Sequence, residues 1–308
     1  MKKIIALALT ALLLISLVAC NSDDTSDLTN IGDYAAPSYT HVTDKGVFTF
    51  KEGAGDTAII TGYTATTTAP HAVTVPATIG EADDRIVTAI GTEAFKEASA
   101  YITSIILPES ITTIEAGAFH SCSSLADINI PDSVTSIGNL AFYGCTSLAT
   151  VKLGENSELV SIGNYAFADC KALEAFSFTN KLESIGTAAF KGSAIKEVKL
   201  PESVTTIGAQ AFVECENLNY EGCITLTAGI TSIGKHAFST DVANIVIPEG
   251  SYAEKYFGLA SEEETTTGEN AEETTEESSE EASEEATDAT TEEPTDAPTE
   301  ETTTAAEA

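Results

Sequence analysis

The sequence predicts a strand-dominated repeat protein, an α/β-type solenoid in which short units stack along one axis. A six-residue motif, Ile-x-x-x-Ala-Phe, occurs seven times, with 22 to 26 residues between successive phenylalanines. Short runs of alternating branched or aromatic residues follow the copies, a pattern typical of half-buried strands. One unit alone buries too little apolar surface to be stable, so we expect the copies to stack. The repeated phenylalanines are Phe95, Phe119, Phe142, Phe167, Phe190, Phe212 and Phe238.

Residues 1–19 are expected to be a bacterial lipoprotein signal peptide. A basic start, Lys2 and Lys3, precedes an apolar stretch over residues 4–18, which is shorter than the roughly 20 residues of a membrane-spanning helix. The stretch ends in Leu-Val-Ala-Cys, which resembles the lipobox, where a cysteine receives lipid and the chain is cleaved just before it. The resemblance implies that Cys20 carries more than one acyl chain, as stable anchoring requires, and that residues 20–37 form a tether. An ordinary secretory signal with an incidental cysteine is the alternative.

Residues 38–86 are expected to form a β cap ahead of the repeats, because an exposed end would present unpaired strand edges. Residues 47–50 and 58–61, Val-Phe-Thr-Phe and Ala-Ile-Ile-Thr, flank the glycine-containing segment 53–56, which predicts a β-hairpin. Residues 73–76, Val-Thr-Val-Pro, have the pattern of a degenerate first repeat strand.

Each repeat from residue 87 onward has three parts. A leucine precedes an alternating strand, as in Leu125-x-x-Ile128-x-Ile130, and Pro131 ends the strand because proline cannot donate to a strand ladder. A second short run ends at the isoleucine of the motif, as at Ile137. The Ala-Phe segment that follows is expected to be a single helical or 3₁₀ turn.

This combination resembles the BspA-like class of bacterial leucine-rich repeats, whose unit reads LxxIxIPxxVxxIGxxAFxxC. The likeness covers residues 87–250 and implies a leucine-rich-repeat solenoid over residues 87–260, its C-terminal cap included. Some positions depart from the pattern: Gly154 and Thr179 replace the proline, Ser193 replaces the cysteine, and residues 219–222 form an insertion beside Cys223.

Two different segments are expected after the last repeat. Ser251 and Glu254 have capping-box spacing and Gly258 is a stop signal, which predicts a short helical cap. Residues 261–308 hold 19 acidic residues and no Lys or Arg, among many Thr, Ala and Ser. Such a composition cannot bury enough apolar area to fold, which predicts a disordered acidic tail. A solvating brush is the simplest role for it, with O-glycosylation or loose cation binding as alternatives.

The charge of the chain argues against nucleic acid as a partner. The formal net charge is −34 at pH 7, and residues 1–260 hold 29 acidic and 14 basic residues, a net of −15. Binding to phosphate backbones depends on Lys and Arg displacing counterions. We therefore expect no nucleic-acid binding.

The cysteines and histidines do not indicate a metal, a cofactor or a nucleophilic site. Four cysteines stand three residues after a repeat phenylalanine, where their side chains should run parallel, and this disfavours both disulfides and tetrahedral zinc. We expect small buried space-fillers, with Cys215 and Cys223 as a possible disulfide because of the insertion between them. The column comprises Cys122, Cys145, Cys170 and Cys215, and the histidines, none at metal-ligand spacing, are His41, His71, His120 and His236.

Outward residues of the repeat strands are the candidate partner-binding face, because successive strands of a solenoid place them about 4.8 Å apart. In leucine-rich repeats this surface binds partners, so the resemblance points to it; merely solvated positions are the alternative. A second column of Thr and Ser precedes the repeat isoleucines and forms either a polar strand face or a carbohydrate-binding stripe. The face candidates are Asp127, Asn129, Lys152, Ser177, Glu197 and Lys199; the hydroxyl column is Thr113, Ser136, Ser161, Ser184, Thr206 and Ser232.

The sequence therefore predicts a non-enzymatic, monomeric lipoprotein on the bacterial cell surface, anchored to the membrane by its lipid. Its expected activity is to bind a protein or glycan through the exposed strand face, as the family resemblance implies. The alternative is a structural or shielding envelope protein without a specific partner.

Overall fold

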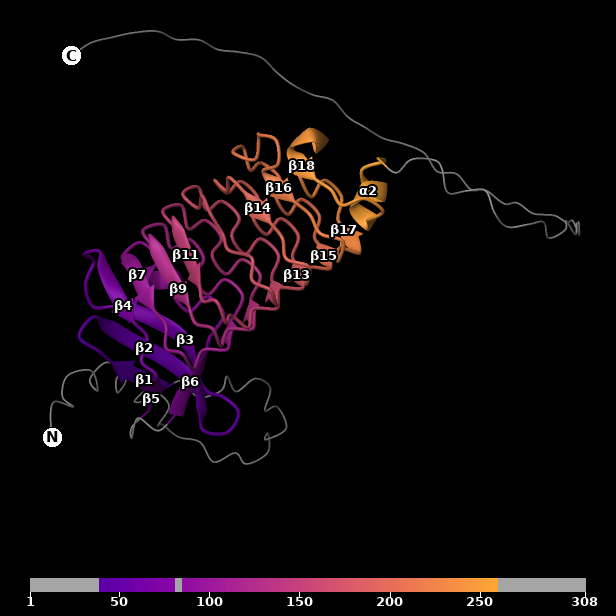
Figure 1. The fold of residues 1–308 in the computed structure, drawn as a ribbon. Coiled ribbons are helices and arrows are strands. Elements are labelled where there is room, and N and C mark those ends of the chain that lie inside the picture. The colour runs from indigo at the N-terminus through magenta and orange to yellow at the C-terminus, as the bar shows by residue number, and fades with distance from the viewer. Residues whose placement is uncertain (1–38, 81–84, 260–308) are drawn as a thin grey trace, which may run out of the picture. The chain divides into compact units, whose positions relative to one another are not determined.

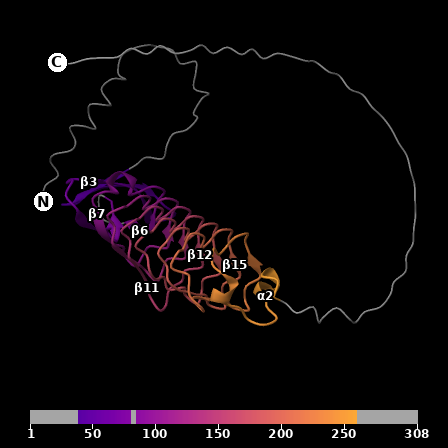
Figure 2. The ribbon, with the colours of Figure 1, turned by 90° about the horizontal axis from the view of Figure 1, so that it is seen from above.

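The computed structural model describes residues 39–80 and 85–259 of the chain. After an N-terminal β cap, these residues form a stack of similar coils that follow one another in sequence order (Figure 1), and the view from above shows the same regular succession (Figure 2). The predicted signal peptide, Cys20 with its tether, and the acidic tail lie outside the described residues.

The N-terminal cap is a small antiparallel arrangement, as predicted. Strand β1 (Tyr39–Val42) pairs with β2 (Gly46–Glu52), and β2 pairs with β3 (Thr57–Ala65) in the expected hairpin. Strand β3 then pairs in parallel with β6 (Arg85–Ile90), which also carries the short antiparallel β5 (Thr78–Ile79), so the cap continues directly into the repeats.

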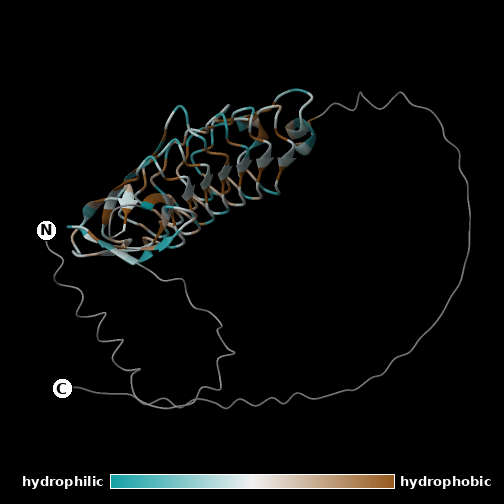
Figure 3. Ribbon diagram, turned by 90° about the horizontal axis from the view of Figure 1, so that it is seen from below, coloured by the Kyte–Doolittle hydropathy of each residue, from teal (hydrophilic) through white to brown (hydrophobic). Residues whose placement is uncertain are grey.

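Each repeat contributes to two faces of the solenoid. On one face, the short strand that ends at the motif isoleucine pairs in parallel with its equivalents before and after it, and Figure 3 shows these strands as a row of arrows. Their hydroxyl residues lie in register from Thr113 to Ser232. The strands are β8 (Thr113–Ile114), β10 (Ser136–Ile137), β12 (Ser161–Ile162), β13 (Ser184–Ile185), β15 (Thr206–Ile207) and β17 (Ser232–Ile233).

On the other face, the alternating runs form two separate parallel sheets. The first sheet includes the predicted degenerate strand at the N-terminal end, and the second lies at the C-terminal end. The first comprises β4 (His71–Thr74), β7 (Ile102–Ile106), β9 (Asp127–Ile130) and β11 (Thr150–Leu153); the second comprises β14 (Val198–Lys199), β16 (Ile224–Thr225) and β18 (Ile245–Val246).

The break between these sheets corrects the prediction of one continuous strand face through Ser177. Between β11 and β14 only an isolated bridge, Thr150 to Ala175, is formed, and Ser177 lies in no strand. This coil carries Phe176 and Phe178 where other copies have branched aliphatic residues. Both rings pack edge-on against the ring of Phe190, at centroid distances of 5.1 and 5.6 Å. We attribute the lost strand pairing to the greater volume of these two rings, which must be accommodated inside the coil.

The core is a column of stacked rings. The seven motif phenylalanines contact one another in sequence, with centroid distances between 5.0 and 5.4 Å. The backbone of the same turns also joins the copies, since the amide of Phe142 donates to the carbonyl oxygen of Ala166 at 2.8 Å. Each coil is therefore held to the next by aromatic packing and by a hydrogen-bonded ladder.

The C-terminal end is closed by the predicted short helix, α2 (Tyr252–Tyr256). The hydroxyl of Ser251 accepts a hydrogen bond from the amide of Glu254 at 3.2 Å. The helix also contacts the preceding coil, because the Tyr256 hydroxyl donates to the carbonyl oxygen of Gly234 at 3.0 Å. Two single 3₁₀ turns, η1 (Lys96–Ala98) and η2 (Val242–Asn244), complete the described elements.

Candidate functional site

The first sheet presents an exposed row of polar side chains. Asp127 lies opposite Thr150, and Asn129 lies opposite Lys152, in the parallel pairing of β9 with β11. All four residues are exposed, whereas the residues between them point into the core. Lys152 makes no ion pair with any described residue, so its ammonium group is available to a partner.

The second sheet carries the other predicted pair of charges. Lys199 and Glu197 form an ion pair at 2.8 Å on the strand face. The hydrogen bond that Lys199 donates to Glu197 and the negative charge of Glu197 raise the pKa of Lys199, with a smaller contribution from Tyr220. Lys199 lies opposite Thr225, which in turn lies opposite Val246. The structure thus groups the face candidates into two patches, with Ser177 exposed between them but outside any strand.

The hydroxyl column lies on the face formed by the short strands. Its members are half-buried or exposed. A neighbouring set of threonines is engaged in holding copies together: the hydroxyl of Thr135 donates to the carbonyl oxygen of Thr112, and that of Thr231 donates to the carbonyl oxygen of Thr205, both at 3.2 Å. Part of the hydroxyl chemistry on this face therefore serves the fold.

The cysteine column is buried and structural. The Cys145 thiol donates to the carbonyl oxygen of Phe119 at 3.1 Å, and the Cys170 thiol donates to that of Phe142 at 3.3 Å. Burial raises the pKa of the Cys145 thiol to about 12 and also raises the pKa values of the other three column thiols. Because the thiolate is the reactive form, these protonated thiols are poor nucleophiles.

Cys215 and Cys223 are not joined in the structure; both are free, buried thiols. The Cys215 thiol donates to the carbonyl oxygen of Phe190 at 3.1 Å, whereas the Cys223 thiol is directed at the carbonyl oxygen of Asn244, 3.7 Å away. The insertion between them therefore turns the two side chains toward different neighbours rather than toward each other.

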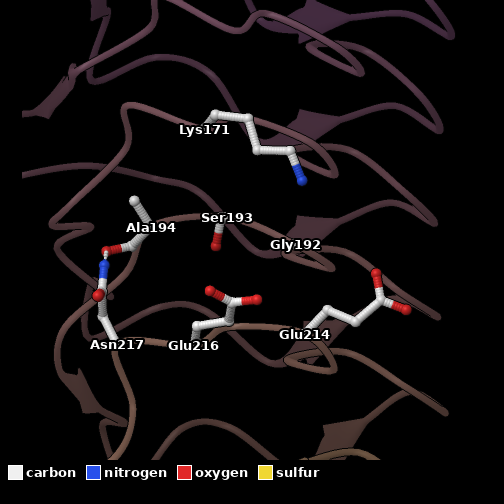
Figure 4. A pocket seen from close by; sticks show the side chains of 7 residues that line it. All are labelled: Lys171, Gly192, Ser193, Ala194, Glu214, Glu216 and Asn217. Atoms are coloured by element: carbon white, nitrogen blue, oxygen red, sulfur yellow. Dashed lines mark hydrogen bonds between the residues drawn. The ribbon is translucent and has the colours of Figure 1, made fainter.

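A polar pocket of about 420 Å³, which sequence reasoning missed, lies on the turns after Phe190 and Phe212. Figure 4 shows Ser193 between Lys171 on one side and Glu216 on the other. Its signal in the sequence is a deletion. Ile195 follows Ser193 by two positions, whereas in the regular copies the leucine follows the column cysteine by three positions.

Two polar side chains that line this pocket are already engaged with neighbouring groups. Lys171 is paired with Asp169 at 2.8 Å, and this hydrogen bond raises the pKa of Lys171, so the ammonium stays protonated. The Asn217 amide donates to the carbonyl oxygen of Ala194 at 2.8 Å. The protonated amine of Lys171 and the hydrogen-bonded amide of Asn217 can bind polar groups, but these two side chains supply neither a nucleophile nor a base.

Two further observations limit the chemistry of the described residues. Across residues 39–80 and 85–259, no three His, Cys, Asp or Glu side chains lie together in a way that could hold a metal ion. Within the same part of the chain, no helix has the length and apolar character needed to cross a membrane.

The comparisons with known proteins agree with the repeat architecture. Residues 88–219 and 161–261 match a family model described as BspA type leucine rich repeat region, in six copies. A crystal structure of a Treponema pallidum leucine-rich repeat protein superimposes with a TM-score of 0.56 and 27% identity, covering 70% of this chain and 94% of that one. A leucine-rich cell surface protein of Faecalibacterium prausnitzii has a TM-score of 0.45 and 22% identity, covering 66% of this chain and 74% of that one. No curated protein gives a significant match.

Proposed function

Because the chain belongs to the family of BspA-type leucine-rich repeat proteins, we propose that it is a cell-surface scaffold that binds a protein or glycan partner through its exposed strand face. The observation that carries the proposal is the arrangement of Asp127, Asn129 and Lys152. These chemically varied side chains are exposed and fixed in register by a rigid sheet. Such pre-organisation lowers the entropic cost of binding.

A scaffold role fits the chemistry better than catalysis does. Proteins of this family are generally repeat scaffolds, and none of the matches indicates a catalytic family. In the described residues, the column thiols are held protonated by burial and Lys171 is held protonated by its partner Asp169. These thiols and this amine are thus not available as nucleophiles.

The anchor we propose is lipid on Cys20, which would place the repeats outside the membrane that holds the acyl chains. Cys20→Ala should abolish the incorporation of radiolabelled palmitate in the producing cell. The matched control is the variant Cys223→Ala, which keeps Cys20 and removes a buried thiol of the repeats. Undiminished labelling of Cys20→Ala would refute the lipid anchor, and the binding proposal would be unaffected.

Binding through the strand face can be tested on a chain of residues 21–308. Purified chain should show saturable capture of a component from extracellular-matrix or cell-wall extracts. Reversing both charges, Lys152→Glu with Lys199→Glu, should change the affinity of this capture markedly, whereas the control reversal Lys45→Glu with Lys235→Glu should leave the affinity unchanged. Capture with unchanged affinity in the first pair would exclude the two lysine-bearing patches of the strand face.

The second candidate function is a shielding or structural envelope role without a specific partner. It is favoured by the acid excess of the sequence, in particular the 19 acidic residues of 261–308. A dense negative tail repels like charges and keeps surfaces solvated. Failure to capture anything from any extract, with the purified chain folded and monomeric, would favour this role.

A further inference from the structure

One repeat is three residues longer than the regular copies, within the segment 219–222 noted in the sequence, and this extension reshapes the strand face at its C-terminal end. In regular copies the first core residue of the strand follows the leucine by three positions, as Val151 follows Leu148. Ile224 follows Leu218 by six positions. The additional residues do not pair with β14 or β18. Places where a repeat departs from its own consensus are where a function specific to one protein is expected.

The extension is a well-defined turn. The amide of Cys223 donates to the carbonyl oxygen of Tyr220 at 3.2 Å, and Gly222 adopts a positive φ of 75°, which a glycine accepts without strain. The Asn219 side chain donates to the carbonyl oxygen of Glu216 at 2.9 Å. Tyr220 is therefore presented on a fixed backbone, which reduces the entropy that a contact there must overcome.

The turn places its tyrosine beside the second sheet. Lys199 is near enough to Tyr220 to interact electrostatically, and a β-carbon built on Gly222 would lie 3.9 Å from a methyl group of Val246. Tyr220 is 48% exposed and Val246 is 50% exposed. We call Tyr220, Lys199, Thr225 and Val246 the Tyr220 patch: an aromatic ring, an aliphatic side chain and a hydroxyl around a Lys–Glu ion pair.

The surroundings of the patch are negatively charged. Glu216 and Asp241 line a second pocket, of about 400 Å³, together with Asn219 of the extension, and Glu221 lies in the turn itself. Among the described residues none of these three carboxylates forms an ion pair, while the charge of Lys199 is already balanced by Glu197. A positively charged partner surface would therefore be attracted, and an anionic one repelled.

We propose that the Tyr220 patch is the contact centre of the strand face and that its occupant is a basic segment of a partner protein that carries an apolar side chain. The inference rests on the proposed binding function and narrows it to one patch and one partner chemistry. Tyrosine is enriched at the centres of protein interfaces, where a few residues supply most of the affinity. Val246 adds apolar area beside it, and the unpaired carboxylates supply the charged rim.

A phage-displayed library of random peptides, selected on the chain of residues 21–308, tests the inference. Enriched peptides should combine Lys or Arg with an aromatic or aliphatic residue, and their binding should weaken as sodium chloride is raised. Tyr220→Ala should weaken a selected synthetic peptide about thirtyfold, the loss typical of a central interface tyrosine. Tyr252→Ala, which removes a 43% exposed tyrosine from α2, is the matched control and should leave binding unchanged.

Charge variants at Thr225 test the partner chemistry and do not depend on the tyrosine. Thr225→Lys should weaken the selected peptides, and Thr225→Glu should bind them at least as tightly as the wild type. Melting curves of the variants show whether each is folded. Equal binding by Thr225→Lys, or enrichment of acidic peptides, would overturn the proposed occupant.

Two other outcomes separate this inference from the proposed function. Peptides that bind Tyr220→Ala normally but are lost in Lys152→Glu would refute the Tyr220 patch and leave strand-face binding intact. Peptides unaffected by either variant, or no enrichment at all, would contradict the inference, whereas the proposed function is decided by the capture experiment on extracts. Saturable binding of uncharged oligosaccharides on a glycan array that is lost in Tyr220→Ala would keep the patch but replace the peptide occupant, which also overturns the inference.

Discussion

The rings of Phe142 and Phe167 stack with their centroids 5.0 Å apart and their planes 4° from parallel. Both side chains are fully buried, so each ring is covered on its faces by the equivalent rings of neighbouring coils. This relationship repeats along the solenoid and explains why the copies depend on one another. It also fixes the coil spacing, on which the register of the exposed strand faces depends.

Truncating one ring of the column should destabilise the described repeats strongly. We expect Phe142→Ala to lower the free energy of unfolding by about 3–5 kcal/mol, because it removes buried area and leaves a cavity. Urea denaturation followed by circular dichroism measures the change. Tyr220→Ala, which truncates an exposed ring, should cost less than about 1 kcal/mol; equal losses in the two variants would show that Phe142 is not a core residue.

Glycines after the motif isoleucine should not accept a side chain. A β-carbon on Gly186 would lie 2.5 Å from the carbonyl carbon of Gly163 in the preceding coil. Backbone atoms cannot move aside as the end of a flexible side chain can. Gly186→Ala should therefore lower the free energy of unfolding by about 1–3 kcal/mol, the usual cost of overpacking. Glu183→Ala, an exposed change in the same coil, is the control for thermal or urea unfolding. An unchanged midpoint for Gly186→Ala would contradict the close approach of the two coils.

The buried thiols predict a loss of stability at high pH. Burial raises the pKa of Cys145 from 9.0 to about 12, so between these values the thiol ionises in the unfolded chain but not in the folded one. Its contribution to stability is complete below pH 9 and disappears as the pH rises through about 12. Unfolding free energies measured from pH 8 upward should fall less steeply in Cys145→Ala than in the wild type. Parallel curves for the two chains would show that this thiol is not shielded.

The sequence was sufficient for the repeat and its periodic core because the same offsets recur in every copy. The hairpin cap, the register of the hydroxyl column and the closing helix at Ser251 follow from local patterns and are confirmed. The strand break at Ser177 was not predictable from alternation alone. Phe176 and Phe178 satisfy the strand pattern, and only their packing against Phe190 shows that the coil must rearrange.

The candidate site was also predictable from the sequence only in part. The exposure of Lys152 and Lys199 follows from strand alternation and is confirmed. The orientation of Tyr220 and the separate partners of Cys215 and Cys223 depend on how one irregular turn closes, for which the repeat offers no template. The irregular spacing after Ser193 and after Leu218 was visible in the sequence, but the pocket and the patch that result required the structure.

Hydrogen exchange of the full chain, followed residue by residue along a urea series, tests the stacked architecture most directly. Each motif phenylalanine from Phe119 to Phe212 donates its amide to the alanine carbonyl of the next coil, at 2.7 or 2.8 Å. We predict that these amides exchange slowest and lose protection together at one urea concentration, because the coils unfold as a unit. Amides of separate coils that open independently, each at its own urea concentration, would contradict the account.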